Sequence, residues 1–239
     1  MTRPAPTPEV HRFVVGPLST NCYVLVAGQR ALVVDPGDEA PRIQAWLEER
    51  HLIPAGIVNT HAHFDHLLGV APLQSHFGVP FALHEEERPV LHRQRAYLLE
   101  HFGYDPGEPP EPDLLLQDHQ WVCVEPEGPM TVAAAPSREA LFCLQVVHTP
   151  GHSPGSVCYR AQGFALVGDL IFQGSVGRAD LRGSDPERLL RSLRRILTEW
   201  PPTLLLYPGH GPETTLGREC QHNPFLLKWF PDRCPGSAR

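Results

Sequence analysis

The sequence predicts an α/β fold in one domain, and three observations carry that prediction. Short apolar and β-branched runs separated by Gly, Pro and Asn fill residues 12–34, which is typical of a meander of strands. Helix-like and strand-like segments then alternate along the chain. A length of 239 residues, with 41% hydrophobic and 20% charged residues, suffices for one sizeable core. We expect a single domain over residues 11–230, between a flexible proline-rich tail (1–10) and a short C-terminal tail (231–239).

The N-terminal half is predicted to alternate strands with helices. Proline is tolerated in the first turn of a helix, so Pro41 is compatible with an amphipathic helix over residues 43–47. Residues 56–59 form a buried strand that runs directly into the polar segment 60–66, which therefore lies on a strand-to-helix turn. The predicted strands are 12–15, 22–26, 31–34, 56–59 and 79–83, and the predicted helices are 43–47, 67–73 and 85–102, followed by a proline-rich loop at 105–112.

The C-terminal half begins with residues 125–140, which carry three prolines and are predicted to form a surface insertion or a hairpin. Strand-like runs resume at 141–147, 157–160 and 164–167. A helix is predicted to begin at 184–187, where a capping side chain, a proline and an acid follow one another. Its buried stripe is Leu189, Leu190, Leu193, Ile196 and Leu197, and its outward face, interpreted as solvated rather than anion-binding, carries Arg188, Arg191, Arg194 and Arg195.

Composition excludes several classes of partner. The formal charge of -7 argues against nucleic-acid or anionic-membrane partners, because those select a concentrated basic surface. No stretch has the apolar length of a signal-peptide core or a membrane span, so we expect a cytoplasmic protein without a membrane partner. The cysteines form no Cys-x-x-Cys pair, so neither a disulfide framework nor a thiolate zinc cluster is expected and most should be reduced packing residues. They are Cys22, Cys123, Cys143, Cys158, Cys220 and Cys234.

The segment from Thr60 to His66 reads Thr-His-Ala-His-Phe-Asp-His and predicts a metal site. Side chains alternate along an extended segment, so His61 and His63 point to one side and can bind one metal ion together. Asp65 and His66 point elsewhere and can bind a second ion, for which a carboxylate beside an imidazole suits zinc, iron or manganese. The competing interpretation is that these residues only cap the following helix, which explains Asp65 but not the three histidines.

Three further segments place a ligand-type residue directly after a strand-like run. They are residues 148–156 with His148 and His152, Gly168-Asp169, and residues 207–211 with His210. Loops at one rim of a sheet are where sites are usually assembled, and together these segments can supply the remaining ligands of a two-metal centre. Each alone is a weak signal, since a histidine after a strand is more often structural.

With these segments in place, the sequence resembles the metallo-β-lactamase superfamily, and within it the glyoxalase II branch in its short form without a C-terminal helical domain. The resemblance runs from about Val15 to Leu227. The matching signatures are Ser19–Tyr23, Val34–Gly37, Thr60–His66, His148–Ser156, Gly168–Phe172, Gly177–Asp180 and Tyr207–Gly211. The fold it implies is a four-layer αββα sandwich, with helices outside two facing mixed sheets and the metals at one edge.

The resemblance also implies a ligand set. One metal would be held by His61, His63 and His148 and the other by Asp65, His66 and His210, with Asp169 bridging them. The cofactors would be two divalent ions, zinc in first place and iron or manganese as alternatives. Asp65 and Asp169 would take part in catalysis. Between the two histidines of residues 148–156, the match favours His148 as the ligand and gives His152 a supporting role. Asp35 would orient the metal loops.

For function, the resemblance implies a metal-dependent hydrolase acting on a small-molecule thioester, such as a glutathione thioester. A thiolate is a good leaving group, so a metal-activated water can cleave a thioester with little help from a general acid. Arg178 matches a basic position that contacts the thiol carrier in relatives, or else is a structural salt-bridge partner. Asp180 and Pro212 stand where the longer relatives have tyrosines, so much of a glutathione pocket is missing.

Two alternative functions remain open. A persulfide dioxygenase shares the fold and would hold a single iron at His61, His148 and Asp169. A binding or regulatory protein with a structural metal belongs to a different class. It is the less favoured one, because structural zinc sites are closed and four-coordinate whereas this ligand set leaves room for water.

Overall fold

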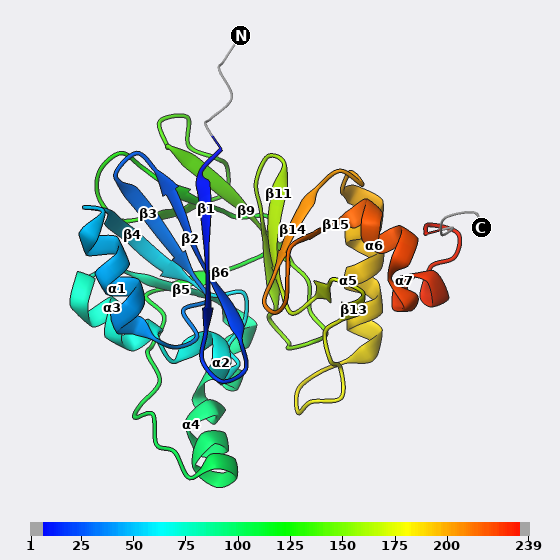
Figure 1. Ribbon diagram of the computed structural model, residues 1–239, viewed down its shortest axis with the longest axis horizontal. Coiled ribbons are helices and arrows are strands. Elements are labelled where there is room, and N and C mark those ends of the chain that lie inside the picture. Colours follow the sequence, from blue (N-terminus) through cyan, green and yellow to red (C-terminus); the bar gives the residue numbers. More distant parts are fainter. Residues whose placement is uncertain (1–6, 235–239) are drawn as a thin grey trace.

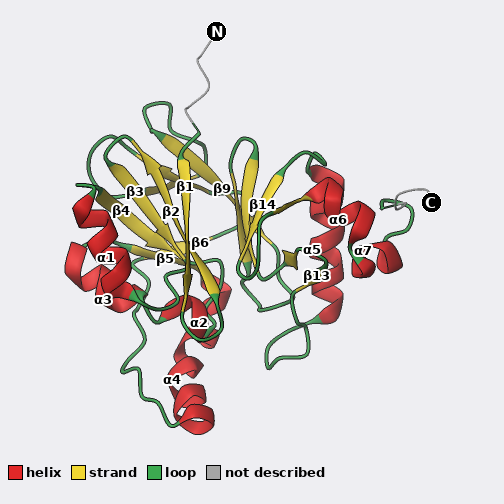
Figure 2. Ribbon diagram, in the orientation of Figure 1, coloured by secondary structure: helices red, strands yellow, loops and turns green. Residues whose placement is uncertain are grey.

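The computed structural model describes residues 7–234 and shows two β-sheets packed face to face between layers of helices (Figures 1 and 2). Helices α1 (Ala40–Glu49) and α3 (Val70–Phe77) cover the outer face of one sheet, and α5 (Pro186–Glu199), α6 (Leu216–His222) and α7 (Pro224–Trp229) lie outside the other (Figure 1). The predicted four-layer αββα fold is thus confirmed.

The first sheet has six strands in the spatial order β1, β2, β3, β4, β5, β6. Their bounds are Glu9–Val15 (β1), Thr20–Ala27 (β2), Arg30–Val34 (β3), Ile53–Val58 (β4), Phe81–His84 (β5) and Leu114–Leu116 (β6). β1 to β3 form the predicted antiparallel meander, and β3 to β6 pair in parallel. Neighbours along β2 pack on opposite faces: Val24 joins the core beneath α1 and α3, and Leu25 joins the core between the sheets. Burial on both faces explains why these strands read as continuous apolar runs.

The second sheet has seven strands in the order β15, β14, β11, β10, β9, β7, β8. Their bounds are Trp121–Val124 (β7), Thr131–Ala133 (β8), Phe142–His148 (β9), Val157–Arg160 (β10), Phe164–Gly168 (β11), Leu205–Pro208 (β14) and Thr214–Thr215 (β15). β8 lies inside residues 125–140 and pairs with β7 just before them, so this segment supplies the turn and the second strand of a hairpin. A separate small hairpin, β12 (Ile171–Phe172) and β13 (Ser175–Val176), follows β11.

Two helices start at other residues, or in another helical form, than predicted. The helix after the histidine segment begins inside it, as α2 (Phe64–Leu67), and continues after Gly69 as α3. The long helix predicted for residues 85–102 consists of a 3-10 turn, η1 (Glu85–Glu87), followed by α4 (Arg88–Phe102). The predicted start of α5 is confirmed, because Asp185 accepts hydrogen bonds from the N–H groups of Glu187 and Arg188.

The arginine face of α5 is only partly solvated. Arg195 Nη1 donates to Asp118 Oδ2 at 2.8 Å and to the carbonyl of His148 at 3.0 Å, so this side chain ties the helix to the second sheet. The prediction that all four arginines face solvent is therefore wrong for Arg195. Helical spacing places a residue on a face but does not show which neighbouring loop covers that face.

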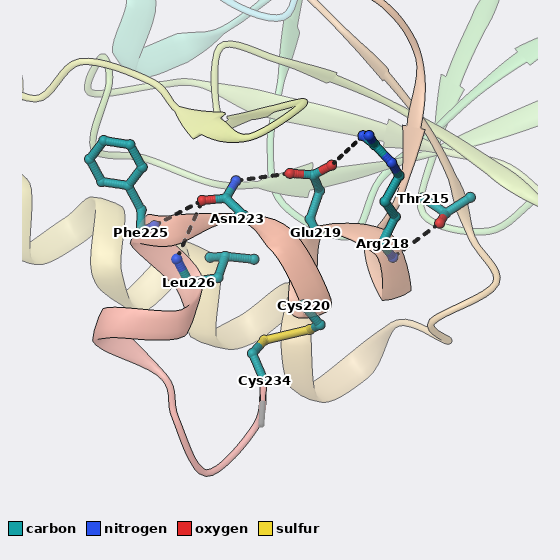
Figure 3. The surroundings of a disulfide bond; sticks show 8 residues. All are labelled: Thr215, Arg218, Glu219, Cys220, Asn223, Phe225, Leu226 and Cys234. Carbon is teal, nitrogen blue, oxygen red and sulfur yellow. Dashed lines mark hydrogen bonds and ion pairs between the residues drawn. A yellow bond between two sulfur atoms is a disulfide. The ribbon is translucent and has the colours of Figure 1, made fainter. Parts of the chain in front are cut away.

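The expectation about cysteines is wrong for four of the six. Cys123 and Cys143 are directly paired across β7 and β9 and form a disulfide with a Cα–Cα distance of 4.1 Å. A second disulfide joins Cys220 on α6 to Cys234 (Figure 3). Sequence separations of 20 and 14 residues gave no local signal, because the pairing depends on strand register and on the path of the chain after α7. Cys22 and Cys158 are buried and free.

The ends of the predicted domain differ slightly from expectation. β1 begins at Glu9, two residues before the predicted start at residue 11. The tails predicted for 1–10 and 231–239 lie partly outside the described residues, at 1–6 and 235–239. Within residues 7–234, no helix combines the length and the apolar character that crossing a membrane requires.

Candidate metal centre

Five histidines and two carboxylates meet where loops from both sheets converge. They are His61 and His63 after β4, Asp65 and His66 on α2, His152 between β9 and β10, Asp169 after β11, and His210 after β14. β11 and β14 are parallel neighbours, so their carboxyl ends bring Asp169 and His210 to the same edge. The backbone N–H of Asn21 donates to the carbonyl of Gly209 at 2.7 Å, which joins the two sheets at this point.

The first group of ligand atoms comes from His61, His63 and His152. Nδ1 of His63 lies 2.9 Å from Nε2 of His152, and the ring of His61 is centred 4.7 Å from that of His63 and 4.8 Å from that of His152. Three imidazoles whose nitrogen atoms converge in this way match the donor set of a zinc or iron site.

The second group comes from Asp65, His66 and His210. Oδ2 of Asp65 lies 3.2 Å from Nε2 of His210 and 3.5 Å from Nε2 of His66. Asp169 lies between the two groups: its Oδ2 is 3.5 Å from Nε2 of His152, and its Oδ1 is 3.5 Å from Nε2 of His66. A carboxylate in this position can bind an ion in each of the two groups.

Buried polar atoms without hydrogen bonds show that these residues fit a metal. Among the described residues, Nε2 of His61, Nε2 of His66 and Oδ1 of Asp169 are fully buried and make no hydrogen bond. Leaving such an atom unsatisfied costs about 1–3 kcal/mol. A bound cation would satisfy all three, and a merely structural histidine cluster would not need to leave them open.

His148 does not join the first group, contrary to the expectation, and His152 takes that place. The ring of His148 stacks on His84, with centroids 4.1 Å apart, and its Nε2 lies 3.1 Å from the carbonyl of Pro154. The reason is the path of the chain. His148 is the last residue of β9 and is held in register opposite Val157, whereas the loop that follows carries His152 out to the metal group.

Asp35 lies where an acid that orients the metal loops is expected. Its two carboxylate oxygens accept hydrogen bonds from the N–H and the hydroxyl of Thr60, both at 2.6 Å, and Oδ2 lies 3.0 Å from Nδ1 of His66. Asp35 has a φ of 50°, a left-handed conformation that is unfavourable for a non-glycine residue. The surrounding contacts hold this strained residue against the base of the site.

Glu87 is a site residue that sequence reasoning missed. Its buried carboxylate accepts a hydrogen bond from the N–H of Ala62 at 2.8 Å and another from the N–H of Gly155 at 2.7 Å. It therefore links the His61–His63 segment to the loop that carries His152. Burial raises the pKa of Glu87, and the Ser153 hydroxyl and the two N–H groups partly offset that effect. A glutamate in a run of three at a helix start carries no sequence signal for this role.

Individual hydrogen bonds and one close backbone contact hold the ligands of the second group in place. Thr20 Oγ1 donates to Oδ2 of Asp65 at 3.0 Å, and the side chain of Asn59 donates to the carbonyl of His66 at 2.8 Å. Glycine is required at position 209, because a Cβ there would clash with the carboxylate of Asp169 and with the His66 ring. The close approach explains why glycine stands directly before His210.

The charges of the centre suit cation binding. Burial and the neighbouring imidazoles hold the pKa of His61 well below its usual value and lower that of His63 to about 3, so both are neutral at pH 7. Burial alone would raise the pKa of Asp65, but His66 and His210 lower it, and the same balance lowers the pKa of Asp169. Neutral imidazoles and ionised carboxylates are the forms that bind metals, so the first group and the two acids are ready for a cation. Burial alone would lower the pKa of His66 and of His210, but the neighbouring carboxylates raise both, so a cation in the second group has to displace protons from these rings.

Arg178 lies at the rim of the centre. Its guanidinium is exposed and paired with Asp180 at 2.9 Å, so the salt-bridge alternative describes its side-chain contact. Its backbone carbonyl lies 2.9 Å from Nδ1 of His152. The residue therefore supports a ligand through its backbone, while its side chain is exposed.

Comparisons with known proteins agree on one family. The family model described as "Metallo-beta-lactamase superfamily" matches residues 15–137 and 140–210. The "Probable metallo-hydrolase YqgX" of Bacillus subtilis is 36% identical over 217 residues, which cover 90% of this chain and 96% of the relative. The "Hydroxyacylglutathione hydrolase GloC" of Haemophilus influenzae is 32% identical over 209 residues, covering 86% of this chain and 92% of the relative.

Solved structures give the same result. BLEG-1, described as a B3 metallo-beta-lactamase, superimposes with a TM-score of 0.77 and 38% identity, covering 91% of this chain and 99% of that chain. TTHA1623, solved in a di-iron-bound form, has the same TM-score and identity and covers 91% of this chain and 100% of that chain. ETHE1 from Myxococcus xanthus, at 21% identity and a TM-score of 0.67, shares the fold.

Proposed function

The chain belongs to the metallo-beta-lactamase superfamily, and on that premise we propose that it is a two-metal hydrolase that cleaves small-molecule thioesters. The observation that carries the proposal is the pair of ligand groups, His61, His63, His152 and Asp65, His66, His210, with Asp169 between them. The metals are two divalent ions, with zinc or iron in first place, and a di-iron relative supports iron.

Divalent metals at such a centre lower the pKa of water towards neutrality and stabilise negative charge on a carbonyl oxygen. The protein's own residues prepare the site. Asp35 and Glu87 hold the loops, and neutral His61 and His63 are ready to bind without first losing a proton. Asp65 is held ionised and accepts a hydrogen bond from Thr20, so its carboxylate would be available to hold the second ion and to orient the attacking water.

The proposal of a thioester substrate rests on the chemistry of its leaving group. Hydrolysis adds water across the C–S bond and releases a carboxylic acid and a thiol. A thiolate leaves without needing a strong general acid, so the centre requires no further acid beyond the residues described. GloC, 32% identical, is named as a hydrolase of this class. The free cysteines Cys22 and Cys158 are buried, and burial raises the pKa of both thiols, so neither is suited to act as a nucleophile.

The rival dioxygenase was expected to hold iron at His61, His148 and Asp169. His148 is stacked on His84, so this enzyme, like the hydrolase, would use His152 in its place. What favours the hydrolase is the second group, whose complete set of side chains a single-iron enzyme does not need.

Metal analysis and a thioester assay on the purified protein test the proposal. We expect two metal ions per chain and release of thiol from simple acyl thioesters, detected with a thiol reagent. One iron per chain, with oxygen consumed when glutathione persulfide is added, would establish the dioxygenase instead. Full metal loading with neither activity would favour a non-catalytic binding protein.

A further inference from the structure

We propose that Glu219 and Asn223 are positioning residues for the metal centre, which they support from a distance through the hairpin of β12 and β13. This hairpin begins two residues after Asp169, and the carbonyl of Arg178, just beyond its end, contacts His152. Holding the hairpin in place therefore holds the carboxylate between the two ligand groups and a ligand of the first group. The inference rests on the proposed function, because it concerns the metals of that site.

Glu219 is a fully buried carboxylate on α6, outside the metal centre. Its Oε2 accepts a hydrogen bond from the N–H of Gly174, at the tip of the hairpin, at 2.7 Å and another from Nδ2 of Asn223 at 3.0 Å. Its Oε1 accepts one from the hydroxyl of Thr214 on β15 at 2.5 Å. Burying a charge costs stability unless donors surround it, and here the donors come from three separate segments.

Asn223 is a second anchor, at the junction of α6 and α7. Its side-chain oxygen caps α7 by accepting hydrogen bonds from the N–H groups of Phe225 and Leu226 (Figure 3). Its Nδ2 donates to the carbonyl of Ser175 in the hairpin at 2.9 Å and to Glu219. The buried amide thus ties both helices to the hairpin.

The hairpin in turn contacts the metal centre at several points. Gly177, directly after β13, lies so close to the backbone of Asp169 that a Cβ at position 177 would clash with its carbonyl. The next residue carries the carbonyl that lies 2.9 Å from Nδ1 of His152. The ring of Phe172 on β12 is centred 6.0 Å from that of His210. A shift of the hairpin would therefore reach ligands of both groups.

The hairpin is too short to hold its own conformation. Its strands have two residues each and pair only as Ile171 with Val176 and Phe172 with Ser175. An isolated two-stranded hairpin is at best marginally stable in water, even when it is longer than this. Its position must therefore come from the contacts at its tip, which are those of Glu219 and Asn223.

The test measures zinc affinity of the full chain by competition with a chromophoric chelator. Glu219→Ala removes both acceptor oxygens and should lower the affinity about tenfold, within the range typical of residues that hold ligands in place. Glu219→Gln keeps one oxygen for the N–H of Gly174 and turns its amide towards Thr214, whose hydroxyl can accept a hydrogen bond. This conservative variant should stay within about threefold of the wild type.

Two further variants separate positioning from the stability of the helices. Thr215→Ala is the matched control, because Thr215 caps α6 by accepting from the N–H of Arg218 at 3.2 Å and does not contact the hairpin. It weakens the same helix and should bind zinc like the wild type. Asn223→Ser keeps a capping oxygen for α7 but lacks the Nδ2 donor, so it should lower zinc affinity as Glu219→Ala does.

Amide hydrogen exchange of the zinc-loaded chain, followed by mass spectrometry, reports on the hairpin directly. Residues 170–178 should exchange faster in Glu219→Ala and Asn223→Ser but not in Thr215→Ala. Zinc loss in these two variants, with no thioester turnover in the wild type, would reject the hydrolase and support the positioning role. Wild-type zinc affinity in Asn223→Ser, an equal loss in Thr215→Ala, or a loss in Glu219→Gln as large as in Glu219→Ala would overturn it.

Discussion

The molecule carries two clusters of histidine and acid, and they differ in what their buried atoms contact. In the metal centre, His61, His66 and Asp169 keep buried atoms without any hydrogen bond among the described residues. The second cluster, formed by His84, Glu86 and His148, also brings ligand-type atoms together. There, Nδ1 of His84 accepts from the N–H of Glu86, and Nε2 of His148 lies 3.1 Å from the carbonyl of Pro154.

Ring orientation separates the clusters as well. His84 and His148 are nearly parallel, with 18° between their planes, so their in-plane lone pairs cannot converge on one ion. His61 and His152 are tilted by 82° and His63 and His152 by 87°, which allows their nitrogen atoms to face a common point. Unsatisfied atoms and convergent lone pairs, rather than the count of histidines, distinguish a metal site from a structural cluster.

The largest difference should appear when the acid of each cluster is replaced in turn. Asp169→Ala removes the carboxylate between the two ligand groups and should lower thioester hydrolysis more than about a hundredfold, with fewer metals bound per chain. Glu86→Gln changes the acid of the second cluster, which pairs with Arg188 at 3.0 Å, and should leave turnover and metal content unchanged. Steady-state rates and metal analysis on both proteins check this. Wild-type turnover in Asp169→Ala would refute the bridging role.

The two histidines of residues 148–156 provide the next comparison. His152→Ala should lose metal from the first group and reduce hydrolysis by about a hundredfold. His148→Ala should keep the full metal content and lose about 1–3 kcal/mol of unfolding free energy, because it removes a ring stack and a hydrogen bond. Metal analysis and urea unfolding measure the two effects. Metal loss in His148→Ala with retention in His152→Ala would show that the geometric distinction is mistaken.

Glu87 tests whether the metal centre depends on its supporting residues. Glu87→Gln keeps one acceptor oxygen but turns an amide towards either the N–H of Ala62 or that of Gly155. We expect metal affinity to fall by about tenfold, within the range typical of residues that hold ligands in place. Glu85→Gln, an exposed neighbour on the same 3-10 turn, is the control and should bind metal like the wild type. A competitive chelator titration gives both affinities, and equal values for the two variants would remove Glu87 from the site.

The part of the site that sequence predicts is the part built from local spacing. His61, His63, Asp65 and His66 lie on one short turn after a strand, and alternation along the chain was enough to group them. His148 and His152 are four residues apart at the end of one strand, and the choice between them depends on how far the loop reaches across the molecule. Glu87 and the Cys123–Cys143 pair depend on contacts between distant segments, for which a single sequence offers no periodicity.

For the fold as well, the elements with local sequence signals were the ones that could be predicted. The strands β1 to β4 and the cap of α5 were predicted because apolar runs, turn residues and capping side chains are local signals. The short strands β6, β12, β13 and β15 were not, because two or three residues carry too little pattern and are held by their neighbours.

The smallest predicted effect concerns protons at the second cluster. Burial, and then the neighbouring His148, lower the pKa of His84 from its usual 6.5 to about 4. Between pH 6.5 and pH 4, His84 binds a proton in the unfolded chain but not in the folded chain. The free energy of unfolding is therefore not reduced by His84 above pH 6.5, and it decreases as the pH falls towards 4. The full loss should be on the order of 3 kcal/mol, given about 1.4 kcal/mol per pKa unit, and most of it has occurred by pH 4.5.

His84→Gln removes this contribution, and the same comparison in a His148→Gln background removes the influence of the neighbouring ring. The difference in unfolding free energy between wild type and variant, measured in urea, should be largest at pH 7.5 and smaller by about 2 kcal/mol at pH 4.5. A difference that stays constant over this range would mean that His84 is protonated in the folded protein as readily as in the unfolded chain. Its ring would then be hydrated, and the second cluster would be looser than its stacked geometry indicates.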